Sequence, residues 1–299
     1  MTRTSTILGP DGQPIVVATL DREIAAPTLT GVRAARADAV VSGMSPERLA
    51  SILRRAQEGD ARDYLTLAIE IEERYLHYAA QLQTRRLSVE AIEPVVEAHD
   101  GIPAAIVEFV EGLVERPDFA DLVGDMLDGI GKGYAVSELM WDYRDKRLWP
   151  TALTRDQRFF HWDRVGLSEL RLAIDGSLDG EALPAAKFVV HAPRIRAGVP
   201  IRRGLARSAA WAYMIQAFAL KDWAAFAEIY GVPLRIGKYH PGASEQDKRT
   251  LMRAVLAIAN DAAIVVPEGM NIEFQEVNGQ RGEAVFGQLI HYVDAQISK

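Results

Sequence analysis

The 299-residue sequence contains no cysteine, which excludes disulfide bonds and thiolate metal sites. It also lacks a long apolar run: near the middle of the chain the longest stretch covers Ala209–Ile215 and stops at Gln216. A membrane-spanning helix needs about 18 such residues, so the sequence predicts none. The N-terminus has neither the basic region, the apolar core nor the small-residue cleavage site of a signal peptide. These absences favour a soluble intracellular protein.

Positive charge is also scarce. Lysine and arginine total 34 against 41 aspartates and glutamates, which gives a formal net charge of −7. Proteins whose whole surface binds nucleic acid usually carry a basic excess that neutralises phosphates, so this balance argues against that class. One local exception is a group of five arginines, called the arginine cluster below: Arg194, Arg196, Arg202, Arg203 and Arg207.

Two hypotheses account for the arginine cluster. A guanidinium can bind phosphate oxygens through two parallel hydrogen bonds, so the cluster is a candidate phosphate contact. Alternatively, these arginines cap helices and pair with acidic neighbours in the same chain or in another copy. The sequence offers many acidic partners, because the chain has a carboxylate excess.

The motifs of nucleotide-binding and hydrolytic enzymes are incomplete or absent. In the glycine-rich segment Gly129–Gly133, Met126 stands where a phosphate-binding loop needs its first glycine. Gly133 follows Lys132 where that loop needs serine or threonine, and the dinucleotide fingerprint fails as well. No serine has the G-x-S-x-G context of a nucleophile elbow. We expect the glycine-rich segment to be a flexible helix-to-strand connection.

Glu70, Glu73 and His77 are the one group with helical spacing suited to a metal. A carboxylate-bridged site in a helical bundle needs a second such set from another helix, and the sequence has no second Glu-x-x-His. We therefore expect a solvated charged face, with no metal and no cofactor. A metal-dependent enzyme that uses these three residues remains an alternative.

The pattern of helices and strands predicts an α+β fold. Residues 1–40 show no sustained period and are expected to form an extended or flexible arm until something holds it. Helices are expected over 45–59, where Ser45 precedes Pro46 as an N-cap, over 60–86, from Pro103 and over 119–127. Strands are expected over 88–98 at a sheet edge, over 134–143 and 148–153 as a hairpin, and over 188–191.

The most unusual segment is Arg203–Tyr230, which has nine alanines and no proline. As one helix it spans about 42 Å at ~1.5 Å per residue. Its aromatic residues point in several directions, so the helix must be buried on more than one side, by its own domain or by neighbouring chains. Gly231 and Pro233 then end it, because glycine adopts the left-handed turn and proline cannot continue a helix.

The remaining residues predict a small unit and a last helix. Strands are expected over 232–236, 262–266 and 270–274, and the capping pattern Ser244–Asp247 opens a helix between the first two. Apolar residues from Phe286 to Ile297 trace one stripe of a final helix. That helix runs to the last residue without a cap, so we expect the sequence to be a fragment of a longer protein.

The order of these blocks resembles that of tailed-phage portal proteins, in particular the portal family of Mu-like phages and prophages. The resemblance covers residues 40–299. It depends on four segments: GMSPERLASILRRAQEGD (43–60), LKDWAAFAEIYGVPLRIGKY (220–239), GASEQDKRTLMRAV (242–255) and VVPEGMNIEFQE (265–276).

This resemblance implies a phage-portal fold. Residues 41–200 would form a wing-like α+β domain, 201–230 the first stem helix, 231–278 the clip domain, and 279–299 the start of a second stem helix, truncated before the C-terminal crown. Stem helices would pack between copies through Trp211, Phe218, Trp223, Phe226 and Tyr230. Gly231 and Pro233 would form the stem–clip turn, and the arginine cluster would contact DNA or a neighbouring subunit.

The resemblance also implies a non-enzymatic function. A portal forms a ring, usually a dodecamer, at one capsid vertex, and serves as the head–tail connector through which DNA is packaged and ejected. Its implied partners are further copies of itself, the terminase large subunit, capsid and head-completion or adaptor proteins, and double-stranded DNA passing non-specifically. Its implied location is the virion, and the host cytoplasm during assembly, with no membrane. A scaffold or DNA-binding protein that forms no ring remains a second alternative.

Overall fold

Helices come first along the chain and antiparallel strands follow, so the expected α+β class is confirmed. The computed structural model describes residues 8, 9, 12, 14, 15, 17–34, 40, 41, 43–230, 234–257, 271–275 and 283–299. The chain divides into two compact units. Unit 1 comprises residues 1–214 with 297–299, and unit 2 comprises residues 215–296.

Five helices lead in unit 1: α1 (Pro46–Gln57), α2 (Arg62–Arg74), α3 (Leu76–Glu90), α4 (Ala104–Val114) and α5 (Pro117–Lys132). Ser45 caps α1 as expected, since its Oγ accepts a hydrogen bond from the Arg48 amide at 3.2 Å. The single helix expected over 60–86 is instead two helices, because the chain bends at the fully buried Tyr75 (φ −97°, ψ 85°).

The edge strand expected over 88–98 is wrong. α3 continues to Glu90, and residues 91–98 form no strand. The Ser88 hydroxyl donates to the Thr84 carbonyl at 2.7 Å, the i to i−4 bond that serine makes inside a helix. The β-branched residues had suggested a strand, but no sheet edge pairs with this segment in the described structure.

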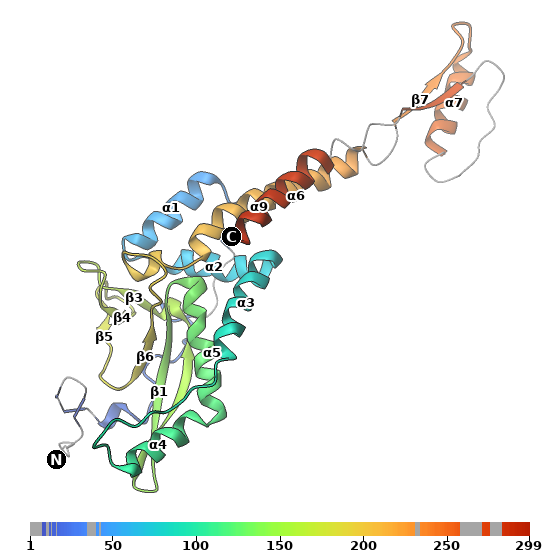
Figure 1. Cartoon of the computed structure of the whole chain (residues 1–299). Coiled ribbons are helices and arrows are strands. Elements are labelled where there is room, and N and C mark those ends of the chain that lie inside the picture. The colour runs from blue at the N-terminus through green and yellow to red at the C-terminus, as the bar shows by residue number, and fades with distance from the viewer. Residues whose placement is uncertain are drawn as a thin grey trace. The chain divides into compact units, whose positions relative to one another are not determined.

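The predicted hairpin is confirmed. Strands β1 (Ala135–Arg144) and β2 (Arg147–Arg155) pair antiparallel, and β6 (Phe188–His191) pairs with β1 on its other side. Asp145 and Lys146 form the two-residue turn with φ of 53° and 61°, as a hairpin turn with both central residues left-handed requires. α5 packs along this sheet, and Figure 1 shows it beside β1.

Three very short strands were not predicted. They are β3 (Phe160–Trp162), β4 (Leu170–Leu172) and β5 (Glu181–Ala182), which form a second antiparallel sheet after the 3-10 turn η2 (Gln157–Phe159). Runs of two or three residues are too short to show the alternation that identifies a strand. Tyr134 connects this sheet to the first, because its hydroxyl donates to the Gln157 carbonyl at 2.7 Å and its ring meets Trp162 edge-on.

Two buried carboxylates bind backbone amides of the N-terminal residues within unit 1. The Glu138 carboxylate on β1, with none of its surface exposed, accepts from the amides of Ile24 (2.6 Å) and Ala25 (3.1 Å). The Glu70 carboxylate on α2 accepts from the amides of Val40 (2.6 Å) and Val41 (2.9 Å). In this way two side chains supply hydrogen-bond acceptors to backbone amides at Ile24, Ala25, Val40 and Val41.

Glu138 is also paired with two cations. Its carboxylate lies 2.9 Å from Arg155 Nε and 3.4 Å from the fully buried Lys187 Nζ. Lys187 also donates to the carbonyls of Leu20 (3.1 Å) and Leu139 (2.8 Å). Burial lowers the pKa of Lys187, and the nearby Glu138 carboxylate opposes that shift. The buried charges are thus compensated by one another and by backbone groups.

The glycine-rich segment is not the flexible connection that we expected. α5 runs through Lys132 and ends at Gly133, whose φ of 110° makes it a left-handed C-cap. Close packing fills this region: a Cβ on Gly204 would come within 2.5 Å of the Gly131 carbonyl oxygen. The glycines here permit a tight approach of two backbone segments, which explains them without any ligand.

The predicted long helix is present as α6 (Ala206–Tyr230). Its residues 206–214 belong to unit 1 and its residues 215–230 to unit 2. None of the helices in the described part of the chain has the length and hydropathy that a bilayer span requires.

Unit 2 also contains strand β7 (Leu234–Lys238), helix α7 (Glu245–Ala257), strand β8 (Asn271–Gln275) and helix α9 (Gln288–Ile297), which a π-helical turn precedes. β7 and β8 pair antiparallel. The predicted capping box is confirmed, because the Asp247 amide donates to Ser244 Oγ at 3.2 Å and the Ser244 amide to Asp247 Oδ2 at 3.0 Å. The strand expected over 262–266 and the turn residues Gly231 and Pro233 lie outside the described residues.

Candidate assembly surfaces

The three residues considered for a metal do not converge. Glu70 is occupied by two backbone amides, and the break at Tyr75 places Glu73 and His77 on different helices. His77 Nε2 instead lies 2.7 Å from Ser298 Oγ. Within the described ranges, no group of three or more histidine or acidic side chains is arranged to hold a metal.

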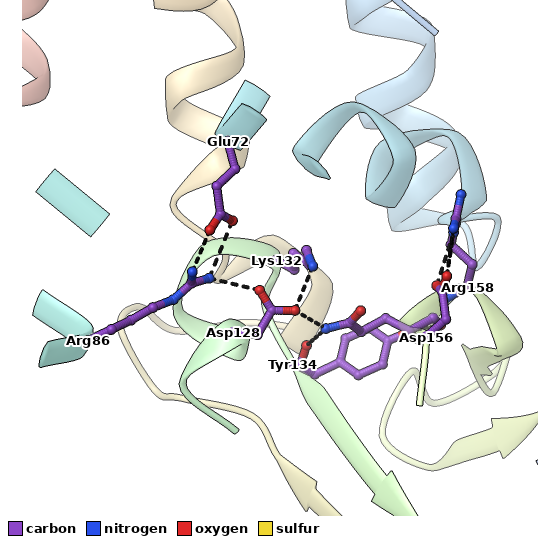
Figure 2. Close-up of polar contacts among 8 residues, drawn as sticks. Glu72, Arg86, Asp128, Lys132, Tyr134, Asp156 and Arg158 are labelled. Carbon is purple, nitrogen blue, oxygen red and sulfur yellow. Dashed lines mark hydrogen bonds and ion pairs between the residues drawn. The ribbon is translucent and has the colours of Figure 1, made fainter. Parts of the chain in front are cut away.

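A chain of polar contacts connects the helices of unit 1, as Figure 2 shows. Arg86 on α3 pairs with Glu72 on α2 and donates to Asp128 on α5 at 2.8 Å. Lys132, one turn further along α5, donates to the other Asp128 oxygen at 2.6 Å. Gln157 donates to the same carboxylate, which brings η2 into the chain of contacts.

These contacts have a structural explanation. Asp128 receives donors from three elements: Arg86 on α3 and Lys132 on α5 are partly exposed, and Gln157 on η2 is buried. Such a network orients α2, α3 and α5 against each other, since breaking one partner leaves another charge unpaired. The network therefore belongs to the scaffold of unit 1.

The arginine cluster lies in unit 1, and its members bind carbonyl and hydroxyl groups. Arg203 donates twice to the Gly198 carbonyl (2.9 and 2.6 Å), Arg207 donates to the Leu53 carbonyl (3.0 Å), and Arg196 donates to Ser208 Oγ (3.0 Å). None of the five arginines forms an ion pair with a described residue. The hypothesis that they pair with acidic neighbours in the same chain is therefore not supported over the described ranges.

The positive charges of the arginine cluster act on one another. Burial lowers the pKa of Arg207, and the charges of Arg202 and Arg196 lower it further. Arg194, Arg196 and Arg202 are exposed. An uncompensated positive surface on a protein with a net charge of −7 is suited to an anionic partner, which is a phosphate backbone or an acidic protein surface.

In unit 1 the start of α6 is largely covered by its own chain. Ala209, Ala210 and Tyr213 are buried, and the Tyr213 ring lies 6.2 Å from that of Tyr75. Trp211 is the exception, with 40% of its surface exposed. This part of the helix thus has one covered face and one exposed aromatic residue.

In unit 2 the same helix is exposed on more than one side. Ile215 and Phe218 are 40% and 42% exposed, and Leu220 is 47% exposed. Phe226 packs against Phe286 at a ring separation of 6.1 Å, and Trp223 is half-buried. Trp211, Phe218, Trp223 and Phe226 are therefore described, whereas the side chain of Tyr230 lies outside the description.

An apolar groove lies between α6 and α9 in unit 2. Its volume is about 520 Å³, and its lining consists of Leu220, Trp223, Ala284, Gly287, Gln288, Ile290 and His291. The sequence had identified Trp223 as a packing residue and Ile290 as part of the apolar stripe of the last helix. The stripe of apolar positions in 286–297 was a signal for a covered face, but it did not reveal a gap beside α6.

A further apolar surface lies on α4. None of its residues is buried, and Ile106 and Val110 are 52% and 37% exposed. Phe109 is held by an edge-on contact with Trp149 at 4.8 Å. Nothing in the described structure shows what covers this helix.

Exposed apolar helix surfaces on an α+β scaffold are typical of the class of proteins that assemble with partners. The family model described as the portal protein of Mu bacteriophage matches residues 65–299. The chain belongs to this family.

Two curated relatives are similar over most of the chain. The portal protein of Escherichia phage Mu is 34% identical over 263 residues, which are 86% of this chain and 51% of the relative. The Mu-like prophage FluMu protein gp29 of Haemophilus influenzae is 31% identical over 269 residues, which are 88% of this chain and 51% of the relative. The chain thus spans about half the length of these relatives.

A solved structure shows a more distant likeness. It is the crystal structure of an HK97-family phage portal protein from Corynebacterium diphtheriae, with 13% sequence identity and a TM-score of 0.33. The match covers 70% of this chain and 64% of the other. At this distance the likeness says nothing of individual residues.

Proposed function

We propose that this protein is a portal: a non-enzymatic, ring-forming head–tail connector at one capsid vertex, through which DNA is packaged and ejected. Membership of the Mu portal family supports the proposal. The observation that carries it is the exposed apolar surface of α6, where Trp211, Ile215 and Phe218 recur at the i, i+4 and i+7 spacing of one helix face.

In this proposal α6 is the first stem helix. Its exposed side chains are buried against neighbouring copies, whereas its start is covered by unit 1 of its own chain. Trp211, Phe218 and Trp223 supply apolar surface for that packing, and Phe226 packs against Phe286 in the turn before α9 of the same copy. Tyr230 is assigned to the same stem, and Gly231 with Pro233 to the turn into the clip.

The partners follow from the same proposal. Further copies complete the ring, expected to be a dodecamer in the full gene product. The clip, residues 231–278, is proposed to meet the terminase large subunit and later the head-completion or adaptor proteins. Double-stranded DNA passes through the channel, and the negative net charge keeps DNA contacts weak. The proposed location is the virion, and the host cytoplasm during assembly.

The arginine cluster is proposed to bind an acidic surface of the next subunit or DNA. Changing Arg202 and Arg203 together to glutamate should lower ring yield or packaged DNA. If both quantities remain at the level of the unchanged protein, the cluster has neither role.

The test of the main proposal is the oligomeric state of the full gene product. Native mass spectrometry and negative-stain electron microscopy should show closed rings with a central hole. A protein that remains monomeric under capsid-assembly conditions, with its apolar helix surfaces still exposed, would rule the portal function out. Metal analysis of the same sample addresses the alternative enzyme: a stoichiometric transition metal would support that alternative.

A further inference from the structure

We infer that Phe218 of one copy inserts into the groove between α6 and α9 of the next copy, so that the stem assembles head to tail. The inference rests on the proposed portal function and names the two surfaces that meet. All residues involved belong to unit 2.

The donor surface is the exposed face of α6 around Phe218. Phe218 is 42% exposed and Ile215, one turn earlier, is 40% exposed. Lys221 and Asp222, each about one turn later, are exposed as well. This face therefore presents two apolar side chains followed by one charge of each sign.

The acceptor surface is the groove. Leu220 and Trp223 line it from α6, and Ile290 and His291 line it from α9. With a volume of about 520 Å³, it is large enough to take an aromatic side chain. Its lining is mostly apolar, so an apolar side chain is the occupant that it favours.

The two surfaces point away from each other. At 3.6 residues per turn, Leu220 and Trp223 lie about 160° and 140° round the helix from Phe218. A copy cannot fill its own groove with its own Phe218, because both are on opposite sides of one rigid helix. A second copy can do so, and it then leaves its own groove open for a third.

The pairing joins the Phe218 face of one copy to the groove of another, so each copy contributes one patch of each kind. A contact between two different patches is heterologous, and such contacts generate rings when the rotation between copies closes.

Thiol cross-linking in the full gene product tests this pairing. The 299 residues contain no cysteine, and any cysteine elsewhere in the gene product is first replaced by serine. The double variant Phe218→Cys with His291→Cys, treated with a short bis-maleimide, should give dimers, trimers and a continuing ladder on denaturing gels. Either single variant should give none, because each presents only one side of the contact. Phe218→Cys with Leu256→Cys is the matched control, since Leu256 is exposed on α7 outside the groove.

The outcomes separate the inference from the function on which it rests. A ladder from the double variant alone supports the pairing. Rings without a ladder, or dimers from Phe218→Cys alone, overturn the pairing and leave the portal function standing. A full gene product that forms no ring at all overturns both.

Discussion

The two units of this protein differ in how far their side chains find partners within the chain. In unit 1 polar side chains bind one another or the backbone, and even the N-terminal segment is held by the buried carboxylates of Glu138 and Glu70. In unit 2 the helices expose Phe218 and Leu220 on opposite sides and leave a groove of about 520 Å³ between α6 and α9. Apart from α4, Trp211 and the arginine cluster, the contacts described for unit 1 lie within its own chain, whereas unit 2 leaves apolar helix surface and a groove open.

This difference indicates how stability and assembly are divided along the chain. A residue of unit 1 whose partners all come from its own chain should affect folding and leave the contact between folded copies alone. A residue on an uncovered face of unit 2 should do the reverse, because its partner is another copy. The first of these expectations concerns Glu138.

Replacing Glu138 with glutamine should destabilise the protein most. The change removes a buried negative charge and leaves Arg155 and Lys187 without it, which typically costs about 3–5 kcal/mol. Urea denaturation followed by tryptophan fluorescence should show the corresponding fall in the unfolding midpoint. The matched control is Glu111→Gln on α4, an exposed position where the change should be below about 0.5 kcal/mol. Equal midpoints for the two variants would show that the buried cluster does not hold unit 1.

Replacing Phe218 with lysine should weaken assembly and leave the unfolding midpoint nearly unchanged. Burial of a phenylalanine side chain contributes about 1.5–3 kcal/mol, so losing it at the contact corresponds to a roughly 10- to 100-fold rise in the concentration for half-assembly. Light scattering of the full gene product over a dilution series measures this. Glu228→Lys, an exposed position on the same helix, is the control. The comparison between the units fails if Phe218→Lys unfolds the protein as strongly as Glu138→Gln does.

The sequence predicted the helices and strands of both units better than the buried side chains that hold them together. The capping patterns at Ser45 and Ser244, the hairpin and the long helix are all local signals, and the structure confirms them. The role of Glu138 depends on contacts with residues more than a hundred positions earlier in the chain, which no local pattern records. Glu70 was assigned to a charged face for the same reason, although only 7% of its surface is exposed.

For the candidate assembly surfaces, the sequence identified several of the side chains but not how they are arranged in space. It selected Trp211, Phe218 and Trp223 because aromatic residues recur along an alanine-rich helix. It did not predict that Trp223 lines a groove with Ile290 and His291, since that groove depends on how α9 lies along α6. Likewise, it identified the arginine cluster but did not predict that Arg203 and Arg207 donate to backbone carbonyl groups.

Replacing Glu70 with alanine should have an intermediate effect confined to unit 1. The change leaves the amides of Val40 and Val41 without their acceptor, which costs about 1–3 kcal/mol for a buried donor. Hydrogen exchange at these two amides should become faster. Glu73→Ala is the matched control, because Glu73 is exposed one turn further along α2. Neither change should alter bound metal; a loss of metal in both variants would revive the enzyme alternative and contradict the anchoring role.

Replacing Asp163 with asparagine should have the smallest effect and should depend on pH. The Asp163 carboxylate accepts from the amides of Glu169 (2.7 Å), Gly166 (2.6 Å) and Ser168 (2.7 Å), and these bonds lower its pKa from 3.8 to about 2. Since the folded pKa lies below the unfolded value, the carboxylate contributes to stability above pH 3.8. That contribution is lost as the pH falls through about 2.

The stability difference between the unchanged protein and Asp163→Asn should therefore be full at neutral pH and shrink on acidification between those two values. Denaturation midpoints measured across this range test the expectation, with Asp179→Asn as the control at an exposed carboxylate that accepts no such set of amides in the described structure. A difference that stays constant with pH would mean that the charge of Asp163 is irrelevant to its loop. Because this loop belongs to unit 1, we expect ring assembly to be unaffected. The same separation of stability from assembly should therefore hold even where the stability effect is small.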